Sequence, residues 1–140
     1  EYVLVNSNLA VMHLQAGDKK AAEEVFDKLF ATDFSRFDYQ PKDEDDDFMS
    51  EILGGDLDAQ IAGVFRQYFA SAKYNAACLY ALTERPEEAV AALREARLKH
   101  PGPYGVAKLS AEHDFDPIRE HPSFAQLLSE IASEGQGEVR

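Results

Sequence analysis

Residues 74–101, YNAACLYALTERPEEAVAALREARLKHP, decide the fold because their apolar side chains recur every three or four residues. This spacing places the apolar side chains on one face of an amphipathic helix. Pro86 interrupts the pattern and suits the first turn of a new helix, and Pro101 prevents that second helix from continuing. The stretch therefore predicts two helices joined by a short turn just before Pro86.

A second copy of this pattern lies near the N-terminus. Ala10 and Ala22 are separated by twelve residues, as are Ala77 and Ala89, and the two copies lie 67 residues apart. Gly17 supplies a flexible end for the first helix of the N-terminal copy. The chain is thus predicted to contain one helical hairpin that occurs twice.

This hairpin resembles the tetratricopeptide repeat, a 34-residue unit with small residues where its two helices touch. The matching residues of the C-terminal copy are Ala76, Ala77, Tyr80, Ala89, Leu93, Ala96 and Pro101. Those of the N-terminal copy are Leu9, Ala10, Gly17, Ala22, Phe26 and Leu29. The resemblance implies an all-α fold of stacked antiparallel hairpins, a tetratricopeptide-like α-solenoid.

The chain also departs from the repeat pattern. Asn6 and Lys73 stand where a large residue is expected, His13 replaces the aromatic residue, and Phe34 replaces the closing proline. Two copies 67 residues apart leave room for a middle repeat, but residues 35–69 do not read as one. The middle unit is therefore predicted to be remodelled into an acidic loop, a short helix and one elongated helix.

These patterns divide the chain into successive segments. The predicted segments are an N-terminal hairpin (1–34), an acidic loop with a short helix near residues 48–53 (35–56), a long helix with the C-terminal hairpin (57–103), capping helices (104–134) and a frayed tail (135–140). The long helix is expected to be capped by Asp56 or Asp58, and Pro122 is expected to begin the last helix. A cap is needed because an end repeat would otherwise expose an apolar face to water.

Composition limits the class of partner. The chain has 140 residues, enough for one domain, and 14 Lys and Arg against 26 Asp and Glu give a net charge of -12. This balance argues against nucleic acid or an anionic membrane surface, which require clustered cations, and favours a protein or peptide partner that is basic or apolar.

Cys78, the only cysteine, allows no internal disulfide and is predicted to be a small buried residue. The sequence leaves the compartment and the oligomeric state open, with a cytoplasmic location favoured.

An acidic run is the most conspicuous local feature. Its members are Asp43, Glu44, Asp45, Asp46 and Asp47. The run lacks the alternating ligands and central glycine of a calcium-binding EF-hand loop. It is either a solvated loop or a docking site for a basic segment. No metal or cofactor is predicted, and the chain has no catalytic motif, so we expect it not to be an enzyme.

Asn8 and Asn75 occupy equivalent positions in the two copies. In tetratricopeptide proteins the corresponding side chain lines a concave groove, where its amide can bond to the backbone of an extended peptide. The alternative is an asparagine that serves packing or lies on the surface. On the groove hypothesis, the residues expected to contact a partner are Asn8, Val11, Tyr74, Asn75, Cys78 and Leu82.

The sequence thus predicts a protein–protein interaction module that binds a peptide or partner domain in a concave helical groove. The alternative is a self-assembling or autoinhibited scaffold, whose groove is filled by its own acidic loop or by another copy.

Overall fold

The computed structural model describes residues 2–34 and 55–137, and all regular structure within these ranges is helical. The elements are α1 (Tyr2–Gln15), α2 (Lys19–Ala31), α4 (Gly55–Leu82), α5 (Pro86–Lys99), α6 (Val106–Ala111), the 3-10 helix η2 (His113–Ile118) and α7 (Pro122–Gly137). The all-α prediction is therefore confirmed for the described residues.

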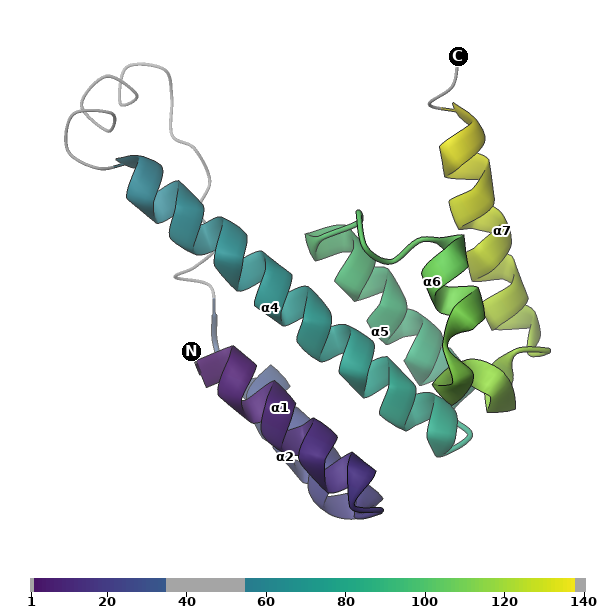
Figure 1. The fold of residues 1–140 in the computed structure, drawn as a ribbon, viewed down its shortest axis with the longest axis horizontal. Coiled ribbons are helices and arrows are strands. Elements are labelled where there is room, and N and C mark those ends of the chain that lie inside the picture. Colours follow the sequence, from purple (N-terminus) through teal and green to yellow (C-terminus); the bar gives the residue numbers. More distant parts are fainter. Residues whose placement is uncertain (1, 35–54, 138–140) are drawn as a thin grey trace.

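Helix α4 is the central element. Figure 1 shows the α1–α2 hairpin on one side of α4, and α5 with the C-terminal helices on the other. With 28 residues, α4 is twice as long as α1, and at 1.5 Å per residue it extends over about 42 Å. The predicted elongated helix is confirmed.

The two hairpins pack in the same way. Ala10 and Ala22 are fully buried, as are Ala77 and Ala89, so small residues meet where the paired helices approach each other. The large side chains that fill the core beside these contacts are Phe26 in α2 and the equivalent Leu93 in α5. The twelve-residue spacing seen in the sequence therefore reflects a repeated helix contact.

The turns of the two hairpins also share one backbone geometry. Gly17 has a φ of +83°, and Glu84, 67 residues later, has a φ of +57°. The amide of Gly17 donates to the carbonyl of Leu14, and the amide of Glu84 donates to the carbonyl of Ala81. A left-handed residue of this kind ends many helices and satisfies their last carbonyl groups. The C-terminal copy thus places a glutamate where the N-terminal copy has a glycine.

Two clusters of buried side chains share α4. One cluster joins α4 to α1 and α2 through residues such as Phe26 and Leu79. The other joins α4 to α5 and the C-terminal helices through residues such as Leu93 and Phe115. Because α4 contributes to both clusters, the hairpins and the tail form one continuous packed body.

The departures from the repeat pattern have a packing explanation. Lys73 places its ammonium 3.8 Å from the ring centroid of Phe30 and 2.7 Å from a carboxylate oxygen of Glu95. Phe34 packs against Phe65, with ring centroids 5.2 Å apart. A cation over an aromatic face and an aromatic pair are both favourable contacts. Lys73 and Phe34 thereby contribute packing where the pattern expects a large residue and a proline.

The tail folds back over the C-terminal hairpin. Phe115 lies 5.7 Å from Tyr74 and 5.5 Å from Phe124, measured between ring centroids, and is fully buried. The capping helices predicted within residues 104–134 include α6 and α7, and α7 begins at Pro122 as expected. Helix η2, which the sequence pattern did not predict, lies between them and brings Phe115 against Tyr74 of α4.

Two boundaries were predicted wrongly. Helix α4 begins at Gly55, so neither Asp56 nor Asp58 precedes it as a cap. Helix α7 continues to Gly137, so residues 135–137 are not frayed. The ion pair between Arg97 and Glu134, with an N–O distance of 2.7 Å, holds the last turns of α7 on α5. The predicted short helix near residues 48–53 lies outside the described residues.

Candidate partner-binding groove

A groove of about 240 Å³ lies between α1, α4 and the start of η2. The residues that line it are Val11, Leu14 and Gln15 from α1, Tyr74, Asn75, Cys78 and Leu82 from α4, and Glu112 and Asp114 from the tail. The structure thus brings together all the residues predicted to contact a partner in the groove except Asn8.

Helix periodicity explains the contribution of α4. Tyr74, Cys78 and Leu82 are four residues apart and therefore follow one face of the helix, with Asn75 beside them. Tyr74 is 7% exposed and Cys78 is 5% exposed, so they form the floor of the groove. Asn75 and Leu82 are half-buried, which leaves part of each side chain accessible from the groove.

Asn75 has a structural contact as well as a place in the groove. Its Nδ2 donates to Ser7 Oγ on α1 over 3.1 Å, and Ser7 is buried. This bond helps to join α1 to α4. The second N–H and the carbonyl oxygen of the amide give Asn75 further capacity to bond a peptide backbone.

Asn8 is exposed on α1 and does not line the groove. Asn8 and Asn75 differ in exposure because Asn75 packs against the hairpin before it, where its bonding partner Ser7 lies. No described hairpin precedes α1. Equivalent positions in the sequence therefore have different surroundings in the fold.

The tail supplies an acidic wall, Glu112 and Asp114, that was not predicted from the sequence. The Tyr74 hydroxyl donates to Glu112 Oε2 over 2.9 Å, and the Asp114 amide donates to Glu112 Oε1 over 3.3 Å. Asp114 lines the same groove as Cys78. Only the folded position of η2 brings Glu112 and Asp114 to α4.

The ionisable groups of the groove have shifted pKa values. Burial, and secondly the charge of Glu112, raises the pKa of Asp114 above its usual range. Burial is also the main cause that raises the pKa of the Cys78 thiol and the Tyr74 hydroxyl, which stay protonated at neutral pH. Because the thiolate is the reactive form of cysteine, Cys78 is an inert part of the floor.

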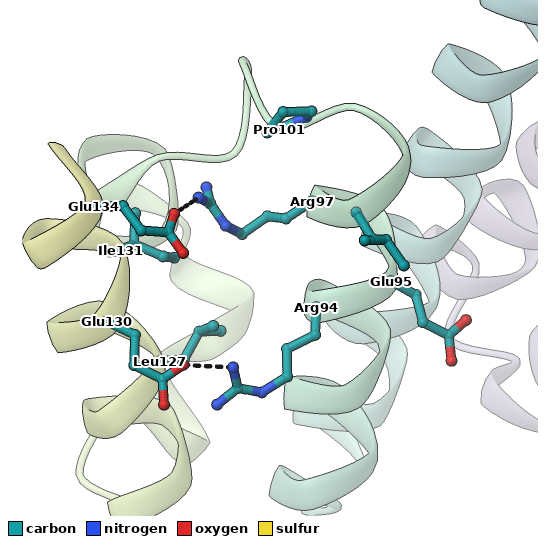
Figure 2. Close-up of a pocket in the computed structure, with 9 residues that line it drawn as sticks. Arg94, Glu95, Arg97, Pro101, Leu127, Glu130, Ile131 and Glu134 are labelled. Atoms are coloured by element: carbon teal, nitrogen blue, oxygen red, sulfur yellow. Dashed lines mark hydrogen bonds and ion pairs between the residues drawn. The ribbon is translucent and has the colours of Figure 1, made fainter. Parts of the chain in front are cut away.

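A second groove, of about 420 Å³, lies between α5 and α7. Figure 2 shows Arg94 and Arg97 extending from α5 towards Glu130 and Glu134 on α7, with N–O distances of 2.5 and 2.7 Å. These charges neutralise one another across the groove. The arrangement attaches α7 to the hairpin, although Leu98 beside it is 83% exposed.

An apolar strip runs along the exposed side of α1. Its members are Val5, Leu9 and Met12, which are 62%, 41% and 65% exposed. The residues found 67 positions later are Ala72, Ala76 and Leu79, all fully buried in the cluster that joins α4 to α1 and α2. On α4 the equivalent face is covered by the α1–α2 hairpin, whereas on α1 this face is exposed.

The described residues show neither a metal-binding cluster nor a membrane-spanning helix. They contain no group of three or more His, Cys, Asp or Glu side chains placed to hold a metal ion. None of the described helices combines the length and apolar character needed to cross a membrane. The acidic run from Asp43 to Asp47 lies outside these residues, and its role stays a prediction.

Comparison with known proteins agrees with the hairpin geometry. Residues 70–96 match the family model described as tetratricopeptide repeat. No curated protein and no solved structure matched the chain. The matched residues cover the C-terminal part of α4 and most of α5, where the small residues Ala77 and Ala89 meet. The resemblance is therefore confirmed for the C-terminal hairpin, whose tetratricopeptide repeat indicates a module for protein–protein interaction.

Proposed function

We propose that the protein binds an extended segment of a partner protein in the groove between α1, α4 and residues 112–114. The observation that carries this proposal is the groove itself, in which side chains from α1, α4 and the tail converge. The repeat in α4 and α5 supports a protein as the partner.

The size and lining of the groove suit a peptide better than a metabolite. Its volume of about 240 Å³ is below the roughly 300–1,000 Å³ common for small-molecule pockets. Val11, Leu14 and Leu82 offer apolar contact, while Gln15 and Asn75 offer amide groups that can pair with a peptide backbone. A segment can place one side chain in the groove and extend its backbone along α4.

The charge of the groove favours a basic occupant. The chain carries a net charge of -12, and Glu112 and Asp114 add two carboxyl groups at the groove itself. These groups would repel the acidic run from Asp43 to Asp47. A basic partner segment is therefore preferred over the alternative in which the protein's own acidic loop fills the groove.

Site-specific photo-crosslinking tests the proposal. A photoreactive amino acid replaces Leu82 in one variant and Ala91, exposed on α5 and outside the groove, in the control. We expect one defined polypeptide segment to crosslink to position 82 and not to position 91. Equal crosslinking at both positions would contradict the proposal. Crosslinks from position 82 to residues 43–47 or to a second copy would support the autoinhibited or self-assembled alternative instead.

Neutralising the acidic run separates its role from that of the groove. We expect replacement of Asp43, Glu44, Asp45, Asp46 and Asp47 by serine and glycine to leave crosslinking at position 82 in place. If the run docks a basic part of the partner, the affinity will fall and become less sensitive to salt, because exposed charges are screened over about 8–10 Å. An unchanged affinity would indicate that the run is only a solvated loop.

A further inference from the structure

We infer that the groove selects a cationic side chain, lysine or arginine, which binds between Glu112 and Asp114. The inference rests on the proposed function, because it assigns the chemistry of the segment that enters the groove. It makes the tail a determinant of specificity as well as a cover for the C-terminal hairpin.

The first support is that Glu112 is held in place. Its carboxylate accepts from the Tyr74 hydroxyl and from the Asp114 amide, over 2.9 and 3.3 Å. Its backbone carbonyl accepts from Arg119 Nη2 over 2.9 Å. A carboxylate fixed from both its side chain and its backbone can meet a cation without a further loss of conformational freedom.

The second support is the position of Asp114. It lines the same groove two residues after Glu112, and Cys78 on the buried floor is part of the same lining. Asp114 and Glu112 therefore place two carboxyl groups in the lining of one small groove. Like charges placed so close disfavour ionisation, and a bound cation would relieve that repulsion.

The third support is that no residue lining the groove carries a positive charge. Arg119 pairs with Asp116 through an N–O distance of 2.9 Å, outside the groove. Lys108 lies over the Tyr74 ring, with its Nζ 5.1 Å from the centroid, and is not part of the lining. In the α5–α7 groove, by contrast, Glu130 and Glu134 each pair with an arginine, and Glu95 pairs with Lys73. No cation in the lining pairs with Glu112 or Asp114, so a cationic side chain of the partner would supply the complementary charge.

The apolar walls suit the rest of such a side chain. Lysine and arginine keep an aliphatic stem on apolar surface while their charged ends reach polar groups. Val11, Leu14 and Leu82 provide that surface, and Asn75 lies among them to pair with the peptide backbone. The apolar lining of the groove thus suits the aliphatic stem of a lysine or arginine, and Glu112 and Asp114 suit its charged end.

Selection from a random library of 12-residue peptides displayed on phage tests the inference with a defined probe. We expect peptides selected by the parent protein to share a lysine or arginine at one position. Replacing that residue by glutamine in the synthetic peptide should weaken binding at least tenfold. This arm requires no protein variant, so it does not depend on any variant folding.

Protein variants then locate the cation. The double variant Glu112→Gln and Asp114→Asn keeps the size of both side chains, and we expect it to bind the selected peptide at least tenfold more weakly. The matched control Glu120→Gln removes a charge from an exposed tail residue outside the groove and should change affinity less than twofold. Equal losses in the double variant and the control would overturn the inference.

A groove-filling variant separates failure of the inference from failure of the proposed function. Leu82→Trp should block every peptide that binds in the groove. Selected peptides without a shared basic residue that Leu82→Trp still blocks would overturn the inference and leave the proposed function standing. Selected peptides that bind Leu82→Trp as tightly as the parent would overturn both.

Discussion

Substituting Glu84 tests the repeated turn that defines both hairpins. Glu84 has a φ of +57°, in the left-handed region, where an L-residue other than glycine pays about 1–2 kcal/mol. Glycine removes this strain but also gives the unfolded chain more freedom, which offsets roughly 0.5–1 kcal/mol. Glu84→Gly should therefore increase the free energy of unfolding by about 0.5–1 kcal/mol.

The N-terminal turn provides the reverse substitution. A β-carbon at Gly17 would have no neighbour within 4 Å, so Gly17→Ala introduces no steric clash. It still forces alanine to adopt a φ of +83°. Gly17→Ala should therefore decrease the free energy of unfolding by about 1 kcal/mol, purely through the backbone.

Equilibrium unfolding in urea, followed by helical circular dichroism, measures these changes. Glu24→Gly is the matched control, because Glu24 is exposed within α2 and glycine there should destabilise the protein by about 0.5–1 kcal/mol. The same chemical change is thus predicted to have opposite signs at positions 84 and 24. If Glu84→Gly destabilises the protein as much as Glu24→Gly does, Glu84 does not adopt the left-handed conformation in the C-terminal hairpin.

Further predictions concern the tail and the groove. Truncation after Pro103 should abolish cooperative thermal unfolding, because it removes the buried aromatic side chains of η2 and α7; a fragment that melts like the full chain would refute this. Asn75→Ala should lose the bond to Ser7, which should lower the free energy of unfolding by about 1 kcal/mol, and it should weaken partner binding several-fold. Asn8→Ala should have neither effect. Thermal melting measures the first effect and a binding titration measures the second. The pKa of Asp114 is raised in the folded protein, so its ionisation opposes folding at neutral pH. Asp114→Asn should therefore increase the free energy of unfolding at pH 7, and this gain should shrink as the pH falls through the carboxyl range. A decrease in the free energy of unfolding at pH 7 would contradict this prediction.

Much of the fold could be predicted from the sequence because helix pairing leaves a periodic record. Ala10, Ala22, Ala77 and Ala89 mark the helix contacts by their spacing, and all four are fully buried. The sequence also indicated the elongated α4, since its apolar pattern continues upstream of the repeat. Exact boundaries were harder to predict, because acidic residues suit both a cap and a first turn.

The groove was only partly predictable. Residues on one helix face are related by spacing, so Tyr74, Cys78 and Leu82 could be grouped from the sequence alone. Glu112 and Asp114 could not be added, because their place depends on Phe115 packing against Tyr74, a contact between segments about 40 residues apart. Asn8 was grouped with Asn75 because the two occupy equivalent repeat positions. Repeat equivalence does not report the neighbours of each position, and Asn8 is exposed whereas Asn75 contacts Ser7 of the hairpin before it.

An ¹⁵N–¹H chemical-shift titration with the library-selected peptide tests the groove most directly, because it reports on every surface of the protein at once. We expect the largest shifts at the Asn75 side-chain amide and at the backbone amides of Leu82 and Asp114. Shifts concentrated around Leu98 in the α5–α7 groove, or around Met12 on the apolar strip of α1, would place the partner elsewhere and contradict the account.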